Sequence, residues 1–235
     1  MSFNFNMCFD EYSASKNKYE SRIFSDLEQE KALQNDYKER EIYELLQNAE
    51  DAGGKAYEEV HISIDYGDDY VSVSNKGGAP FSEAGFASIL RAHQSSKIGE
   101  DLIGNKGLGF RSVLNWAREI VICSNGNKCV FSEEIANQKW KQIQEIMRER
   151  LGQKDAQLII DDVNNKVRLK GFKTSLAILS VPKHSYISRD DNYTTKISLK
   201  IEDNEDVRKS IIKQINSLNE EILLFLSKRL RDSIL

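Results

Sequence analysis

The sequence predicts an α+β fold, in which a mixed, mostly antiparallel sheet is covered on one face by helices as a two-layer α/β sandwich. Apolar and polar residues alternate in short segments that flank turn signals, which is typical of hairpins. The expected elements run helix, hairpin, helix, loop, helix, then strands and helix, unlike the strict alternation of a parallel sheet. No internal repeat and no linker rich in Pro, Gly or Ser divides the chain. We therefore expect one domain over residues 26–235, preceded by an N-terminal arm over residues 1–25.

Local signals place the elements of the first half of the chain. Residues 1–20 are polar with scattered aromatic residues and are expected to form an arm or strap. A helix over residues 28–52 ends at Gly53-Gly54, and EEVHISIDYG and DYVSVSN form a hairpin around a GDD turn. FSEAGFASILRAH is a short helix with Ser82 as its N-cap. SSKIGEDLIGNKGLGF is expected to be a loop, and FRSVLNWA turns helical after it.

The second half of the chain starts with another hairpin signal. REIVICSNGNKCVFSE contains Asn125-Gly126 between alternating segments, and this dipeptide is typical of a tight hairpin turn. A charged helix is expected over residues 133–151, and residues 156–172 are expected to include a polar, mobile stretch; together they suggest a family-specific insertion over 133–172. TSLAILSVP and TTKISLKIE are predicted to be strands, and a long helix over residues 205–230 closes the fold.

Composition excludes several classes of protein. The 235 residues are 40% hydrophobic and 30% charged, as in soluble globular proteins, and no apolar run reaches the length of a membrane span. The N-terminus lacks the basic start and apolar stretch of a secretory signal. Three scattered cysteines, Cys8, Cys123 and Cys129, fit a reducing cytoplasm and oppose a disulfide frame or a zinc site. A net charge of −4 gives no indication of a nucleic-acid partner.

A polar stripe on the first helix raises a functional question. In EIYELLQNAEDAGG, the side chains of Glu44, Asn48 and Asp51 lie at spacings of four and three residues, beside the apolar face of the helix. Such a stripe is either a solvated surface or the wall of a polar pocket. Taken alone, it is more often a solvated surface.

Two glycine-rich turns accompany this helix. SNKGGAPF, residues 74–81, directly follows a predicted strand, and GNKGLGFRS, residues 104–112, opens a helical segment. Each turn alone is compatible with an ordinary connection. The helix and both turns, in this order and on these elements, resemble the GHKL superfamily of ATP-binding domains, which have the Bergerat fold and include DNA gyrase B, MutL and sensor histidine kinases.

The resemblance covers most of residues 28–230 and is closest to the sacsin-type branch of ATPases related to heat-shock chaperones. It rests on NAEDAGG, on APF after the glycine turn, on IGNKGLGFRSV and on a late EEILLFL. SSKIGEDLIGNKGLGFRSVL also looks like the lid of MutL, where a serine-lysine pair precedes a GFR turn.

The resemblance assigns roles to the helix. In the family, a helix asparagine holds Mg²⁺ together with the nucleotide phosphates, and Asn48 matches it; an oxygen ligand suits this hard cation. A glutamate one turn earlier activates the water that attacks the γ-phosphate, and Glu44 matches this catalytic residue. Asp51, followed by Ala52, matches the position at which a carboxylate faces the nucleotide pocket.

The resemblance also places the base of the nucleotide. Asn75 stands where the family has an aspartate that accepts a hydrogen bond from the adenine amine, and its side-chain carbonyl can accept the same bond. Pro80, which follows the turn, is also expected to bind ATP. The turn has one residue more before this proline than is usual, so both Gly77 and Gly78 are candidates for the glycine beneath the base. Thr195 matches a late strand threonine that contacts the base through water, with Thr194 in place of the usual glycine.

The phosphates are expected at the second glycine turn, where backbone amides at a helix N-terminus favour anions. The predicted ATP-binding residues there are Gly104, Asn105, Lys106, Gly107, Leu108, Gly109 and Phe110. Lys97, Lys106 and Arg111 are the nearby cations, and Lys97 corresponds to the lysine of the MutL-like lid.

These matches predict a slow, Mg²⁺-dependent ATPase of cytoplasmic location, whose lid closure drives a conformational switch or homodimerisation within a larger chaperone-like or defence-like machine. The expected ligands are ATP, ADP and Mg²⁺, and the expected partners are further domains or partner proteins. No membrane is expected, and nucleic acid is not indicated by this segment. Three alternatives stay open: a nucleotide-gated clamp that scarcely hydrolyses ATP, a histidine kinase, and a scaffold that has lost its nucleotide. The absence of a visible phospho-accepting helix disfavours the kinase, and the presence of both Glu44 and Asn48 disfavours the scaffold.

Overall fold

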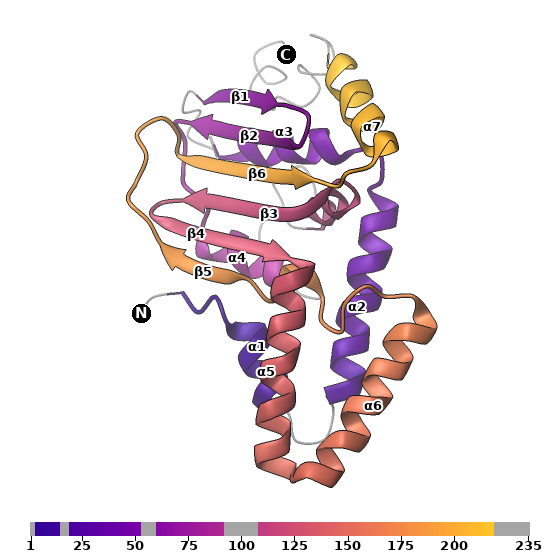
Figure 1. Cartoon of the computed structure of the whole chain (residues 1–235). Coiled ribbons are helices and arrows are strands. Elements are labelled where there is room, and N and C mark those ends of the chain that lie inside the picture. Colours follow the sequence, from indigo (N-terminus) through magenta and orange to yellow (C-terminus); the bar gives the residue numbers. More distant parts are fainter. Residues whose placement is uncertain (1–2, 15–18, 53–59, 92–107, 219–235) are drawn as a thin grey trace, which may run out of the picture.

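The computed structural model of the chain describes residues 3–14, 19–52, 60–91 and 108–218. It is an α+β structure, in which six antiparallel strands form one sheet and helices lie behind it and beyond one edge (Figure 1). None of the described helices combines the length and the apolar character needed to cross a bilayer.

The sheet is built from two hairpins and two later strands. Its spatial order is β1-β2-β6-β3-β4-β5, and every neighbouring pair is antiparallel. The strands are β1 His61–Tyr66, β2 Tyr70–Lys76, β3 Ala117–Ser124, β4 Asn127–Ser132, β5 Lys183–Tyr186 and β6 Thr195–Ile201. Both predicted hairpins are confirmed, and Asn125 and Gly126 have the positive φ angles that their tight turn requires.

The inner face of the sheet forms the core with α3, Glu41–Asp51, and the 3₁₀ helix η1, Gly109–Asn115, which both contact its strands. Helix α4, Glu83–Leu90, adds Phe86, Ile89 and Leu90 to the buried core. Alternate strand residues, such as Val73, Ile122 and Ile197, are buried on this face. The predicted cap of α4 is confirmed, because Ser82 Oγ accepts a hydrogen bond from Gly85 N over 3.0 Å. The segment FRSVLNWA was expected to be helical, and it forms the 3₁₀ helix η1.

The single helix predicted over residues 28–52 is wrong. The chain forms α2, Tyr19–Asp36, and α3, separated by a break in which Glu39 has a φ of 66°. The buried carboxylate of Glu41 stabilises the start of α3, since it accepts hydrogen bonds from Gln214 and Asn115. No proline or glycine marks the break, so only these distant contacts reveal it.

The N-terminal residues are helical and well packed. They form α1, Met7–Ala14, in which Cys8 and Tyr12 are buried. Phe5 precedes this helix and stacks on His184 with ring centroids 3.8 Å apart. Residues 3–14 thus contribute to the core, where an arm or strap was expected.

The polar, mobile stretch expected within 156–172 is also wrong, because residues 156–170 belong to α6, Gln153–Lys170. With α5, Glu133–Leu151, this helix forms a hairpin that projects beyond the sheet beside α2 (Figure 1). Trp140 Nε1 donates a hydrogen bond to Asn164 Oδ1 between the two helices. The buried residues of α6 recur at helical spacing and carried the signal: Ala156, Ile160, Val163 and Val167.

The strand predicted in TSLAILSVP is not formed. Residues Ile178–Ser180 make the short 3₁₀ helix η2, and strand β5 begins only at Lys183. The cause is Glu30 of α2, whose carboxylate accepts hydrogen bonds from the amides of Ile178 and Leu179 over 2.7 and 2.9 Å. The closing helix is confirmed as α7, Glu205–Asn216, but it ends there, before residues 217 and 218. Residues 219–230 of that prediction lie outside the described part.

Candidate functional site

A cavity of about 150 Å³ lies between α3, α4, η1 and the inner face of the sheet. Of the predicted site residues, seven line it, and they come from four segments that are distant in the sequence: Asn48, Asp51, Ala52, Asn75, Pro80, Phe110 and Thr195. The remaining wall is mostly apolar and includes Leu45, Val73, Phe81, Ile89 and Ile197. The cavity therefore combines a mostly apolar lining with a small number of polar groups.

Helix α3 supplies one wall of the cavity. Its apolar face, which includes Ile42, Leu45 and Leu46, is buried against the core, so the adjacent stripe is held beside the cavity. Asn48 is half-buried, and within the described part of the chain its side chain makes no hydrogen bond. Its amide is therefore available to a ligand.

A polar row crosses the inner face of the sheet at the end of the cavity. Register places Asn75 of β2 opposite Thr195 of β6, and Thr195 opposite Ser124 of β3. All three side chains are buried. The hydroxyl oxygens of Ser124 and Thr195 are 2.8 Å apart, and Ser124 Oγ also accepts a hydrogen bond from Phe81 N over 2.9 Å.

The side chain of Asn75 is held in one orientation. Its Nδ2 donates a hydrogen bond to the carbonyl of Gly77 over 2.9 Å. No donor from the described residues reaches its Oδ1. Because Asn75 lines the cavity, this arrangement leaves one buried carbonyl acceptor for a ligand.

The turn after β2 requires its two glycines. Gly77 and Gly78 have φ angles of 86° and 72°, which side chains other than glycine rarely adopt. Gly77 N donates to Thr194 Oγ1 over 3.1 Å, and Ala79 N donates to the carbonyl of Ala52 over 2.7 Å. The turn thus joins the end of α3 to the start of β6. Neither glycine lines the cavity itself.

Glu44 lies one turn before Asn48, against the start of η1 rather than on the wall of the cavity. A Cβ atom placed on Gly109 would be 1.9 Å from Glu44 Oε2, so the absence of a side chain at Gly109 makes room for the carboxylate. Burial raises the pKa of the Glu44 carboxyl, and the Arg40 guanidinium, 3.4 Å from Oε1, opposes this increase. Leu108, also predicted to bind ATP, precedes η1 and does not line the cavity.

The phosphate role considered for Arg111 is wrong. Its side chain is buried, and Nη2 donates a hydrogen bond to the carbonyl of Ile89 in α4 over 2.7 Å. Burial lowers the pKa of this guanidinium, and the negative charges of Glu30 and Asp26 counter the effect. Arg111 therefore joins η1 to the end of α4.

Five predicted site residues lie outside the described part of the chain: Lys97, Gly104, Asn105, Lys106 and Gly107. Their predicted contacts with phosphate stay predictions. The described segments on either side, α4 and η1, both line the cavity through Ile89 and Phe110.

Sequence reasoning missed Ser124 and the contact of Thr194 with the glycine turn. Ser124 occurs at the end of a predicted strand, where alternation alone places it on the inner face. Its partner is known only once β6 is inserted between β2 and β3. The missing signal is thus the strand order and not the residue pattern.

Protein side chains alone do not make a metal site in the described part of the chain, which contains no group of three or more His, Cys, Asp or Glu that could hold an ion. An ion beside Asn48 would depend on ligands supplied by a bound molecule and by water. No known family model matches the chain, and no curated protein is significantly similar to it.

Proposed function

We propose that the chain is a GHKL-type ATP-binding domain with a Bergerat fold, which hydrolyses ATP slowly in the presence of Mg²⁺. One observation carries this proposal: residues predicted from four separate motifs meet at a single cavity. A random distribution of solvated motifs over the surface would not converge in this way.

The volume and lining of the cavity support binding of a nucleotide base. A closed apolar cavity of about 150 Å³ holds one six-membered aromatic ring. This cavity has about the same volume, 150 Å³, but it is open to solvent, so it would hold part of a two-ring base while the rest of the nucleotide extends through the opening. Apolar groups such as Val73 and Ile197 would contact the faces of the base, and Asn75 Oδ1 would accept a hydrogen bond from the adenine amine. Guanine presents a carbonyl at that position, which would face another acceptor, so the site should favour adenine.

The α3 stripe supplies the remaining groups. Asn48 is the available oxygen ligand for Mg²⁺, which would neutralise phosphate charge when bound. Glu44 holds an acceptor oxygen against the backbone of η1, at the end of the second glycine turn. In its ionised form it would take a proton from the attacking water, and its raised pKa makes it a stronger base than an exposed glutamate.

Calorimetric titration tests binding. ATP and a non-hydrolysable analogue would be titrated with and without Mg²⁺ into the wild type, Asn48→Ala, and the matched control Asn137→Ala on the exposed face of α5. We expect metal-dependent binding that Asn48→Ala weakens by at least about tenfold, while the control binds normally. Absence of binding under all conditions would refute the proposal.

Turnover tests the catalytic role. Glu44→Gln keeps the size of the side chain but removes its ionisation, so we expect turnover to fall by about 10²–10⁴-fold while the affinity for ATP is unchanged. Glu149→Gln, at an exposed position of α5, serves as the control. Binding without measurable turnover in the wild type would instead favour the nucleotide-gated clamp.

A further inference from the structure

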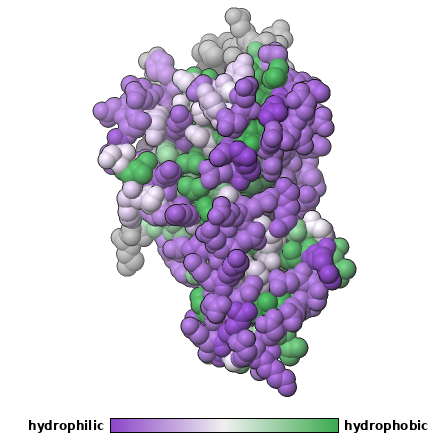
Figure 2. Space-filling model, in the orientation of Figure 1, coloured by the Kyte–Doolittle hydropathy of each residue, from purple (hydrophilic) through white to green (hydrophobic). Residues whose placement is uncertain are grey.

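The outer face of the sheet is a separate surface, which none of the described helices covers (Figure 1). Hydrophilic residues cover most of the molecule seen from this side (Figure 2). The strand positions on this face include many small hydroxyl residues: Ser63, Ser72, Ser74, Ser132, Ser185 and Ser198. Ser72 and Ser132 are buried among their neighbours, and Val121 and Val130 are apolar members of the same face. The other four serines are at least partly exposed, so the face is more polar than the inner one.

Positive charge is concentrated on this outer face. The whole chain has a net charge of −4, but lysines outnumber carboxylates on the strand positions of this face. The carboxylates are those of Asp65 and Glu119, and the lysines are Lys76, Lys128, Lys183, Lys196 and Lys200. Within the described part of the chain, none of the five lysines forms an ion pair. Lysines elsewhere do, for example Lys166 with Asp162 and Lys170 with Glu28.

Four of these lysines form a diagonal line across the sheet. Lys76 is on β2, Lys196 on β6, Lys128 on β4 and Lys183 on β5. Lys196 and Lys128 are level with each other across the sheet. Lys76 and Lys183 each lie one outward-facing position further along their strands, in opposite directions. Strands are about 4.8 Å apart and alternate residues about 6.8 Å apart, so successive lysines are spaced by about 8–10 Å over a length of about 24 Å. We call these four residues the lysine diagonal. The two carboxylates lie off it.

Two further groups lie on the lysine diagonal. Cys123 of β3 is between Lys196 and Lys128 in the register. Burial raises the pKa of its thiol, whereas the charge of Lys128, a hydrogen bond with Tyr193 and the charge of Lys196 lower it. The ammonium groups of Lys128 and Lys196 thus both influence Cys123. Tyr193 thus adds an aromatic ring beside the cationic line.

A hollow of about 390 Å³ lies at the end of the sheet where the lysine diagonal begins. Its lining includes Lys76, Cys123, Tyr193 and Arg189, together with two carboxylates of the same loop, Asp190 and Asp191. Asp190 Oδ1 already accepts hydrogen bonds from the amide and side chain of Asn192. The hollow is therefore a polar recess with an aromatic wall.

We propose that the outer face of the sheet binds single-stranded nucleic acid along the lysine diagonal, with one base in the hollow beside Tyr193. Unpaired ammonium groups and hydroxyl donors suit a phosphodiester backbone, and an aromatic side chain gives a base a stacking surface. Because recognition is through the backbone, binding is expected to depend little on sequence. This role does not depend on the nucleotide cavity of the inner face.

Other polyanions fit this surface less well. A duplex is read by a helix or ribbon that enters its groove, and a six-stranded sheet is too broad to enter one, whereas a flexible single strand can follow a diagonal. The centre of a protein interface is usually depleted of charged residues, but here lysines run through the centre of the face. The net charge concealed this surface, because acidic residues elsewhere outweigh it.

Fluorescence anisotropy tests the proposal. The full chain would be titrated into labelled oligothymidylate and oligouridylate of about 12 residues, a duplex and an oligoglutamate of equal length. We expect both single strands to bind more tightly than the duplex or the peptide, and any difference between them shows whether DNA or RNA is preferred. The logarithm of affinity should fall with the logarithm of salt concentration with a slope of about −2.8 if four phosphates are neutralised.

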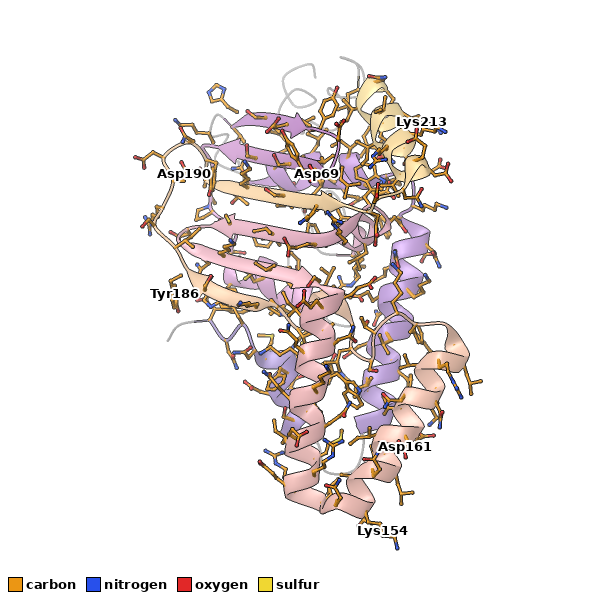
Figure 3. The ribbon with its side chains drawn as sticks, in the orientation of Figure 1. Asp69, Lys154, Asp161, Tyr186, Asp190 and Lys213 are labelled. Atoms are coloured by element: carbon orange, nitrogen blue, oxygen red, sulfur yellow. The ribbon has the colours of Figure 1, made fainter. Side chains whose placement is uncertain are left out.

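The double substitution Lys128→Ala/Lys196→Ala should weaken binding at least about tenfold and make the salt slope shallower by about 1.4. Lys128→Arg/Lys196→Arg should retain binding. The matched control, Lys141→Ala/Lys154→Ala, removes the same charge from exposed positions of the α5–α6 hairpin, and Lys154 lies at its tip, far from the sheet (Figure 3). No binding by the wild type, an equal loss in the control, or tighter binding of duplex or oligoglutamate would each overturn the proposal.

Discussion

The two ends of the sheet's inner face are built from the same strands but differ in character. At one end, Val71, Leu199 and Ile120 are neighbours across β2, β6 and β3, and all three are buried and apolar. At the other end, the same strands present the polar row of Asn75, Thr195 and Ser124. A buried polar group costs free energy unless it is hydrogen-bonded. The apolar end therefore stabilises the fold by packing, whereas the polar end holds side chains that form hydrogen bonds.

The largest effect on stability is expected at the apolar end. Leu199→Ala removes a fully packed side chain from the centre of the sheet and should lower the free energy of unfolding by about 2–5 kcal/mol. Urea denaturation monitored by circular dichroism measures this change. A loss of unfolding free energy below about 1 kcal/mol would mean that packing at the apolar end contributes little to stability.

At the junction with α3, Gly109→Ala should separate catalysis from folding. The added Cβ would occupy the position of the Glu44 carboxylate, which can move away because it ends a flexible side chain. We expect turnover to fall to the level of Glu44→Gln, with a shift in melting temperature of only a few degrees. Steady-state ATPase assays and thermal unfolding provide the two measurements, and normal turnover would show that the position of Glu44 is not required.

The polar end should show a smaller, coupled effect. Ser124→Ala and Thr195→Val each remove one partner of the same hydrogen bond, so each should cost about 0.5–1.5 kcal/mol, and the double variant should cost less than their sum. A double-mutant cycle from denaturation curves gives the coupling energy. Strict additivity would indicate that the two hydroxyls act independently.

The smallest effect concerns the ion pair on α3. As the proposed base, Glu44 acts in its ionised form, so turnover should fall as the pH decreases through its raised pKa. Arg40 lowers that pKa, and Arg40→Ala should therefore raise it further and move the acid limb of the turnover profile to higher pH. Because Arg40 is 58% exposed, solvent screening keeps the shift small.

Lys38→Ala removes an equal charge from an exposed position two residues before Arg40 and is the control for this prediction. Its acid limb should coincide with that of the wild type. A shift to lower pH in Arg40→Ala would contradict the role assigned to Glu44 as the base.

Local patterns predicted much of the fold. Alternation of apolar and polar residues, together with turn residues, predicted both hairpins. Helical spacing predicted the capped helix α4 and the charged helix α5. Each of these signals lies within a short segment of the sequence. Where the prediction of residues 156–172 failed, the spacing of Ala156, Ile160, Val163 and Val167 did contain the information. Polar composition was given too much weight there.

Distant contacts decided the remaining elements. The carboxylate of Glu30 accepts hydrogen bonds from the amides of Ile178 and Leu179, so a segment with strand composition becomes a 3₁₀ helix. Arg111 directly follows a glycine-rich turn, the pattern from which a phosphate contact was expected, yet it is buried near Glu30 and Asp26. Neither outcome can be read from neighbouring residues, because the partners lie tens of positions away.

The sequence alone was sufficient for the α3 stripe of Glu44, Asn48 and Asp51, because helical periodicity is a local property of the backbone. The tertiary structure alone placed β6 between the two hairpins, and with it Thr195 between Asn75 and Ser124. It also gathered lysines from four strands into one diagonal on the opposite face. Strand order and register depend on pairing between distant segments, and the alternation within a strand specifies its two faces but not its neighbours.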